Sequence, residues 1–369
     1  MRILYDGHIY SHPIIGGICR YFNNIIGRLP ENVSPILVLD QRRQIPYPVH
    51  PNLNILSYQK RHLPASRVFY WLDKYYFRPL SRCTHPDIMH PTYYALLNYQ
   101  ELSNYDCPIV LTVYDMIYEK FHTTLQDAEW HIHMKQKAIQ AAQAIICISE
   151  HTKHDLLERY AVPEQKVRVI YLASELTLEA MNGSETVPPR PYYLYVGSRA
   201  WYKNFDGLLQ AFAKAVSVQA DMSLCVVGPP LAEPETSMLG AYGLQDHVDY
   251  YGYVSDHHLA KLYNQSIALI YPSFYEGFGI PPLEAMACGT AVIASNTSSL
   301  PEVIGNAGML FDPYALDELT EMLLFLRKNP TERAKFVERG RQRVKQFSWE
   351  TTAHQTLAVY RSLTTRETT

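Results

Sequence analysis

The sequence has no run of about 18 apolar residues, so we expect no segment that spans a membrane. The chain starts with MRILYDG, which is typical of a β-strand, and we expect no signal peptide before it. No two cysteines have C-x-x-C spacing, and the six cysteines are scattered. This distribution disfavours a zinc site or a disulfide framework and favours reduced thiols. Together these absences predict a cytoplasmic protein.

A strong excess of basic residues is also missing. Lysine and arginine number 33 against 36 acidic residues, and the net charge is −3. Nucleic-acid-binding proteins are usually strongly basic on one face, so we expect no nucleic-acid partner. The chain has 369 residues, of which 47% are hydrophobic and 19% charged. These values are typical of a globular protein with two domains.

The glycine motif G-x-G-x-x-G is absent, which disfavours a dinucleotide-dependent dehydrogenase. A shorter pair, Gly16–Gly17, lies between the first predicted strand and a helix predicted from the spacing of apolar residues over 18–29. Further strands and helices alternate along the chain, which predicts an α/β fold with parallel sheets. The segment 181–191 contains glycine, serine and three prolines between apolar strands, and we interpret it as a linker.

The stretch 271–289, YPSFYEGFGIPPLEAMACG, has the most specific pattern in the chain. A buried strand is followed by a loop with Gly277 and Gly279 and by a helix predicted to start at Pro281–Pro282. Free amides and the helix dipole at such a start favour an anion. Glu276 and Glu284, with seven residues between them, could accept hydrogen bonds from hydroxyl groups. An anion site between two carboxylates that accept from hydroxyl groups suits a nucleotide-sugar, in which phosphates join two sugar rings.

The sequence EGFGIPPLEAMACGTAVIAS resembles the E-x7-E signature of the retaining glycosyltransferases of family 4. The resemblance implies the GT-B fold, an α/β architecture of two Rossmann-like parallel-sheet domains facing across a cleft. It implies an acceptor-binding domain at 1–182, a nucleotide-sugar-binding domain at 183–348 and a helix at 349–369 that crosses back to the first domain. The alternative is an ordinary strand–turn–helix with two solvated glutamates.

A second segment, VGSRAWYKNFDGLLQAF, resembles the other donor motif of the family. The resemblance implies that Arg199 and Lys203 neutralise the departing diphosphate and that Glu276 contacts the transferred sugar, so these three are the predicted catalytic residues. A basic loop that caps a sheet is the alternative. The predicted donor-binding residues are Gly16, Gly17, Gly228, Val254, Gly277, Phe278, Gly279, Ile280 and Glu284, the last on the ribose.

A D-x-D motif, which metal-dependent GT-A transferases use to hold Mg²⁺ or Mn²⁺, is absent. We therefore expect no catalytic metal and no cofactor, with a UDP- or GDP-sugar as substrate. In the first half, many relatives carry His–Asp after the strand CPIVLTV, whereas this chain has Tyr114–Asp115. Tyrosine is a poor base near neutral pH. Front-face attack, in which the leaving phosphate takes the acceptor's proton, would need no such base. Tyr114, Asp115 and His90 are candidates for positioning the acceptor or sugar, with a structural role as the alternative for His90.

The segment 58–83 is basic and aromatic, with apolar residues at helical spacing. One hypothesis is a peripheral contact with the inner membrane leaflet beside a lipid-linked acceptor, and the other is a helix packed on its own sheet. The resemblance implies a metal-independent, retaining hexosyltransferase that acts on a glycan or lipid-linked acceptor in bacterial polysaccharide or lipopolysaccharide biosynthesis. The alternatives are a GT-B sugar-nucleotide epimerase and a non-catalytic nucleotide-sugar-binding subunit.

Overall fold

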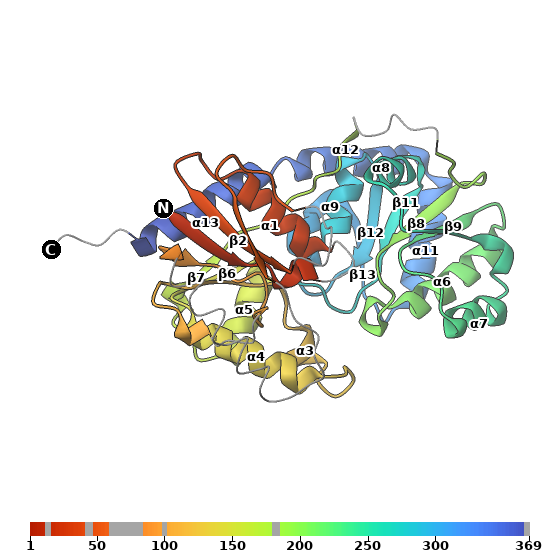
Figure 1. Cartoon of the computed structure of the whole chain (residues 1–369). Helices are drawn as coiled ribbons and strands as arrows, with labels where there is room; N and C mark the ends of the chain where they lie inside the picture. The colour runs from red at the N-terminus through yellow and green to blue at the C-terminus, as the bar shows by residue number, and fades with distance from the viewer. Residues whose placement is uncertain (12–15, 41–46, 59–83, 98–101, 179–184, 365–369) are drawn as a thin grey trace. The chain divides into compact units, whose positions relative to one another are not determined.

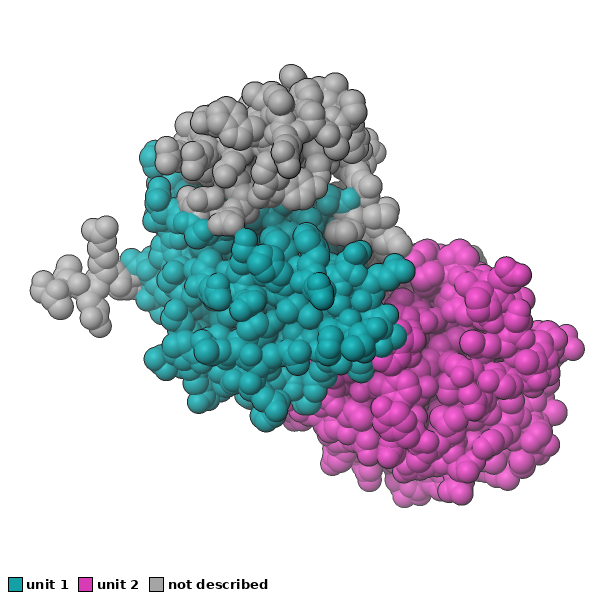
Figure 2. All heavy atoms as spheres, turned by 90° about the horizontal axis from the view of Figure 1, so that it is seen from below, with its two compact units in different colours: residues 1–172, 349–369 teal, residues 173–348 magenta. Residues whose placement is uncertain are grey.

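The computed structural model describes residues 1–11, 16–40, 47–58, 84–97, 102–178 and 185–364. The chain forms two compact units, shown in Figure 2. Unit 1 contains Met1–Leu172 and Trp349–Thr369, and unit 2 contains Ala173–Ser348. The division therefore lies before residue 182, the boundary expected from the sequence. Residues 59–83, on which the membrane-contact hypothesis depends, lie outside the described residues, as do residues 181–184 of the expected linker.

Unit 1 is built on parallel strands, as the alternation of strands and helices predicted. One sheet has the order β3-β2-β1-β4 and a second has the order β5-β6-β7. A parallel bridge between Met89 and Ile109 connects β4 to the start of β5, so the two sheets form one parallel series. The strands are β1 (Arg2–Asp6), β2 (Ser34–Asp40), β3 (Asn54–Tyr58), β4 (Ile88–Met89), β5 (Val110–Val113), β6 (Ala144–Cys147) and β7 (Val167–Val169).

The helices of unit 1 bury the faces that their apolar spacing predicts. Helix α1 (Gly17–Gly27) buries Tyr21, Phe22, Ile25 and Ile26. Ser149 caps the start of helix α5 (Glu150–Arg159) by accepting a hydrogen bond from the Thr152 amide at 3.0 Å. The remaining helices are α3 (Ile117–Lys120), α4 (Ala128–Ala141) and α13 (Trp349–Thr364).

Helix α13 comes from the end of the chain and packs against α1 and β4 (Figure 1). Its Tyr360 hydroxyl lies 2.6 Å from Nδ1 of His90 and 3.2 Å from the Tyr5 hydroxyl. Nε2 of His90 lies 2.9 Å from Oγ1 of Thr112 on β5. The imidazole is fully buried, and burial lowers the pKa of His90 to about 3. A neutral histidine therefore connects the last helix to the sheet.

Unit 2 contains one parallel sheet with the order β10-β9-β8-β11-β12-β13. Helices α6 and α11 pack on each other over one core, whereas α9 packs against α8 and α12 (Figure 1). The strands are β8 (Tyr192–Val196), β9 (Ser223–Val227), β10 (Val248–Gly252), β11 (Ala268–Tyr271), β12 (Ala291–Ser295) and β13 (Met309–Phe311). The helices are α6 (Phe205–Val218), α7 (Glu233–Ala241), α8 (Asp256–Gln265), α9 (Ile280–Ala287), α10 (Leu300–Ile304), α11 (Leu316–Lys328) and α12 (Pro330–Val344).

Among the residues that the structure describes, none of the helices combines the length and the apolar character needed to cross a bilayer.

We predict that His90 makes folding stability depend on pH. Its pKa in the folded chain lies below the value of about 6.5 of an unfolded histidine, so the unfolded state binds more protons as the pH falls below 6.5. Stability from this group is complete above pH 6.5 and is lost as the pH falls toward 3. His90→Gln, which keeps a polar side chain without a titrating ring, should flatten the dependence by up to about 1.4 kcal/mol per pH unit. Urea unfolding from pH 4.5 to 7.5 measures this.

The matched control is His354→Gln, which changes an exposed histidine on the same helix α13. It should leave the slope of the wild-type protein unchanged. If the free energy of unfolding had the same pH dependence in wild type and in His90→Gln, the assignment of this dependence to His90 would be contradicted.

Candidate functional site

The carboxyl edge of the unit 2 sheet contains the point where strand order reverses. Strand β8 lies between β9 and β11, so the chain after β8 and the chain after β11 leave the sheet side by side and continue in opposite directions. Ligands of open α/β sheets bind at such a switch point, because the diverging loops leave a crevice there. Lys203 follows β8 in the short helix Trp201–Lys203, and Glu276 follows β11. Two of the three predicted catalytic side chains therefore follow the two strands that flank the switch point.

Glu276 and Lys203 form a direct ion pair. The Lys203 Nζ atom lies 2.6 Å from Oε1 and 2.8 Å from Oε2 of Glu276. Ser273 Oγ also donates to Oε1 at 2.6 Å. The Glu276 residue is only 6% exposed, and the Lys203 side chain is 16% exposed. A buried carboxylate needs partners of this kind, so the solvated glutamates of the alternative interpretation are not what the structure contains.

The phenol of Tyr271, at the end of β11, completes the surroundings of the ammonium group. Its hydroxyl lies 3.4 Å from Lys203 Nζ. Burial, and then the negative charge of Glu276, raise the pKa of Tyr271 well above its ordinary value. The phenol therefore stays protonated at neutral pH and serves as a neutral hydrogen-bonding group.

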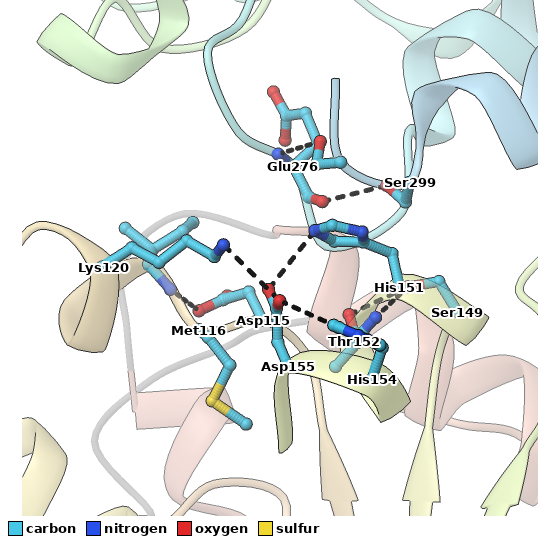
Figure 3. A network of polar contacts seen from close by, with 12 residues as sticks. Asp115, Met116, Lys120, Ser149, His151, Thr152, His154, Asp155, Glu276 and Ser299 are labelled. Atoms are coloured by element: carbon cyan, nitrogen blue, oxygen red, sulfur yellow. Dashed lines mark hydrogen bonds and ion pairs between the residues drawn. The ribbon is translucent and has the colours of Figure 1, made fainter. Parts of the chain in front are cut away.

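The backbone around Glu276 is held by two serines that follow β12. The Glu276 amide donates to Ser298 Oγ at 2.9 Å. Ser299 Oγ donates to the carbonyls of Glu276 at 2.9 Å and Phe278 at 2.7 Å, and the Ser299–Glu276 contact is visible in Figure 3. This role of the two serines was not predicted from the sequence. The available signal was that these serines directly follow a predicted strand of the same sheet.

Arg199 has a different partner from Lys203. Its guanidinium Nε lies 2.6 Å from Oε1 of Glu235 in α7, and Nη2 lies 3.1 Å from Oε2. Nη2 also donates to the carbonyls of Pro229 and Pro230, each at 2.8 Å. The side chain is 3% exposed, and its Nη1 atom is buried without a hydrogen-bond partner in the described part of the chain. The two cations expected to act as a pair are therefore held by separate carboxylates.

Gly228 lies beside the unpartnered Nη1 atom of Arg199. A Cβ atom at Gly228 would lie 2.3 Å from the Gly197 carbonyl oxygen and 3.7 Å from this Nη1 atom. The Gly228 amide donates to the Gly252 carbonyl at 3.0 Å, which connects the ends of β9 and β10. Val254 follows β10 and is half-buried. These predicted donor residues all belong to the carboxyl edge of one sheet.

Helix α9 starts at Ile280, one residue before the predicted start, and has eight residues. Gly279 precedes it with φ of 123°, and a Cβ atom there would approach Leu300 Cδ2 to 3.0 Å. Pro281 and Pro282 have no N–H, and the Leu283 amide donates to the Gly279 carbonyl at 3.4 Å. The expectation of an amide-rich first turn is therefore corrected, because the prolines leave few amides free for an anion.

The second carboxylate of the pair, Glu284, projects from α9 and is 6% exposed. Its Oε2 accepts a hydrogen bond at 3.0 Å from the hydroxyl of Tyr263, which is fully buried in α8. Gly277 and Phe278 are also buried, and the Phe278 ring packs edge-to-face on Phe347 with centroids 5.9 Å apart. The loop between Glu276 and Glu284 is thus part of the unit 2 interior.

In unit 1 the predicted positioning residues are bonded internally. Tyr114 is buried, and its hydroxyl donates to the Thr92 carbonyl at 3.0 Å. Asp115 is half-buried, with Oδ1 accepting from the Ile117 amide at 3.0 Å. His90 has both ring nitrogens bonded and is fully buried, so in this conformation it presents no nitrogen to a ligand. Its observed role is structural.

Gly16 and Gly17 are exposed at the start of α1, and a Cβ atom at Gly16 would meet nothing within 4 Å. Open space at this position is compatible with the approach of a ligand, but it makes glycine dispensable on steric grounds. Residues 12–15, which precede the pair, lie outside the described residues.

A polar cluster at the start of α5 was not predicted. Asp155, 6% exposed, lies 3.4 Å from Lys120 Nζ, 3.3 Å from His151 Nε2 and 3.8 Å from His154 Nδ1. Figure 3 shows the three side chains gathered around this carboxylate. His154, Asp155 and Glu158 have ligand atoms close enough together to share a metal ion. The Lys120 ammonium group on the same carboxylate opposes a cation there, since like charges repel.

Two family models match the chain. Residues 15–176 match Glycosyltransferase Family 4, and residues 179–343 match Glycosyl transferases group 1. O-antigen chain mannosyltransferase B of Escherichia coli is 31% identical over 239 residues, which span 62% of this chain and 62% of that protein. MMP alpha-(1->4)-mannosyltransferase of Mycolicibacterium hassiacum is 28% identical over 290 residues, which span 74% of this chain and 70% of that protein.

Solved structures of similar fold cover nearly the whole chain. Sucrose-phosphate synthase from Thermosynechococcus elongatus superposes with a TM-score of 0.78 at 21% identity and covers 98% of each chain. Anabaena HepE, solved with UDP-glucose, has a TM-score of 0.75 at 16% identity and covers 98% of this chain and 100% of its own. At these identities the likeness shows the fold. The chain therefore belongs to the family 4 glycosyltransferases and has their GT-B fold, with two Rossmann-like domains.

Proposed function

We propose that this chain transfers a hexose from a nucleotide-sugar to a glycan or lipid-linked acceptor in bacterial polysaccharide or lipopolysaccharide biosynthesis. The observation that carries the proposal is the Lys203–Glu276 ion pair at the switch point of the unit 2 sheet. Family membership supports sugar transfer as the reaction class. In this proposal unit 2 binds the donor and unit 1 binds the acceptor.

The ion pair divides two tasks between its members. The ammonium group of Lys203 has three N–H donors, so it can donate to Glu276 and to a diphosphate at the same time. Its positive charge then balances the negative charge that develops on the leaving phosphate. Glu276, held by Ser273 and the backbone contacts of its loop, accepts hydrogen bonds from hydroxyls of the transferred sugar. Glu284 accepts from the ribose. Arg199, with its buried Nη1 atom beside Gly228, adds positive potential on the β9 side of the site.

We further propose retention of the anomeric configuration and independence of metal. The bond from the anomeric carbon to the diphosphate oxygen breaks while the bond to the acceptor oxygen forms on the same face. The acceptor's proton passes to the leaving phosphate. Tyr114, buried and protonated because burial raises its pKa, has no part in that proton transfer. Lys203 and Arg199 supply the charge that a bound metal ion supplies elsewhere.

The donor is identified by a thermal-shift screen, since a ligand that binds the folded state raises the melting temperature. GDP-mannose and UDP-glucose are the first compounds to test. Two relatives of this chain are named mannosyltransferases, and the HepE structure contains UDP-glucose. If the melting temperature rises with none of these compounds and with no other UDP- or GDP-sugar, the proposal is contradicted.

Replacing Lys203 by methionine should lower kcat about 100- to 1000-fold, because the leaving phosphate loses a preorganised cation. Glu276→Gln should also lower kcat, since the amide cannot hold the ammonium group as a charge partner. Transfer assays with the donor found in the screen measure both. Lys214→Met is the matched control, because Lys214 lies in the same unit on α6 and pairs with exposed Asp317. If the Lys203→Met variant had the kcat of the wild type, the ion pair would have no role in the mechanism.

The product should keep the anomeric configuration of the donor, and excess EDTA should change the initial rate less than about twofold. Proton NMR of the anomeric signals during the reaction measures the stereochemistry directly. An inverted product would exclude the same-face reaction, and loss of activity restored by Mn²⁺ would exclude metal independence. A reaction with the donor alone in the NMR tube tests the epimerase alternative, which would convert the sugar without an acceptor.

A further inference from the structure

Three aromatic side chains gather at the carboxyl edge of the unit 2 sheet. Trp201 follows β8, Phe274 follows β11 and Tyr314 follows β13. The Phe274 ring is stacked on Tyr314, with centroids 4.9 Å apart and planes inclined by 26°. The Trp201 and Phe274 centroids lie 6.4 Å apart, with planes inclined by 39°. We call these three residues the aromatic platform.

The platform exposes its rings to an unusual degree. Tyr314 is 78% exposed and Trp201 is 43% exposed, while Phe274 between them is half-buried. Single exposed hydrophobic residues are common on protein surfaces, but a contiguous group of large rings more often marks a binding surface. Aromatic rings also lose little side-chain entropy on binding, which suits them to contact a ligand face.

One buried amide holds the three loops together. Asn204 is 7% exposed, and its Nδ2 donates to the carbonyls of Pro272 at 3.2 Å and Pro313 at 3.1 Å. These prolines belong to the loops that carry Phe274 and Tyr314, and Asn204 belongs to the loop that carries Trp201. The Phe274 amide donates to the Tyr202 carbonyl at 2.8 Å. The three loops that carry the rings are therefore joined to one another by hydrogen bonds that need no ligand, which favours a preorganised site.

The platform is adjacent in the chain to the ion pair and belongs to other loops than the predicted donor-binding residues Gly228 and Val254. Trp201 precedes Lys203 by two residues, and Phe274 precedes Glu276 by two residues. Gly228 and Val254, predicted to contact the nucleotide, follow β9 and β10 on the other side of β8. The loops after β8 and β11 thus carry platform residues together with the two members of the ion pair, whereas Gly228 and Val254 belong to the loops after β9 and β10.

We propose that the aromatic platform binds a pyranose ring of the acceptor glycan, so that unit 2 takes part in acceptor binding. A pyranose has an apolar C–H face that can stack on aromatic rings and a rim of hydroxyls that can reach polar neighbours such as the Lys203–Glu276 pair. The platform residues themselves carry no charge, which favours a neutral sugar over an anionic phosphate. This inference rests on the proposed function, because it identifies the stacked ring as the acceptor.

The test measures binding of two uncharged probes, α-mannotriose and maltotriose, by saturation-transfer NMR with the full chain. The wild-type protein should transfer saturation to ring C–H protons of at least one probe. The double variant Trp201→Ala, Tyr314→Ala should weaken that binding about 10- to 100-fold, since each ring contributes about threefold to tenfold. The variant Trp201→Phe, Tyr314→Phe keeps both rings and should retain binding. Phe325→Ala removes an aromatic ring of α11 in the same unit that is 40% exposed and is the matched control.

Donor binding is measured on the same samples by the thermal shift with GDP-mannose and UDP-glucose. An unchanged donor shift together with weakened glycan binding in the alanine variant supports the inference. Equal loss of donor and glycan binding, unchanged glycan binding, or no binding of either probe to wild type would overturn it. If wild type binds glycan through the platform but shows no donor shift, the platform stands as a glycan site and the proposed transferase function fails.

Discussion

The buried carboxylate of Glu276 is the constraint on which the site depends. An ionised carboxylate that is nearly removed from water is stable only with a cation and hydrogen-bond donors close by. The cation is Lys203, which reaches Glu276 only because β8 and β11 are neighbours in the sheet. Ser273, after β11, donates to the carboxylate, and Ser299, after β12, donates to the backbone carbonyl of Glu276. The reversal of strand order and the charge arrangement are therefore parts of one structural solution.

Two cations that are four residues apart in the chain serve different partners. Arg199 is held by Glu235 and two proline carbonyls, whereas Lys203 is held by Glu276. Asn204, the next residue, binds the loops after β11 and β13 through its side-chain amide. The segment after β8 thus contacts the loops after β9, β11 and β13. This rigidity is what a site needs if its charges are to stabilise a reaction without rearranging.

Much of the architecture followed from the sequence, because the spacing of apolar residues and the positions of capping residues, glycines and prolines are local properties. The helical spacing of apolar residues in α1, the Ser149 cap and the strand that ends before Glu276 are all present in the structure. The start of α9 was displaced by one residue, and the proline content of its first turn reduces the amide donors that were expected there. His90, for which a positioning role and a structural role were both open, is part of the contact between α13 and the unit 1 sheet.

By itself the sequence determined the α/β class, the family and the identity of the residues at the strand ends, because these are recorded in short-range patterns of residue type. The tertiary structure decided which charges are paired: Glu235 with Arg199, Glu276 with Lys203, and Asn204 with two distant carbonyls. Such pairings join segments separated by tens of residues, and they depend on strand order and loop geometry. No local pattern encodes them, since the same side chains could pair in several ways until the sheet brings particular loops together.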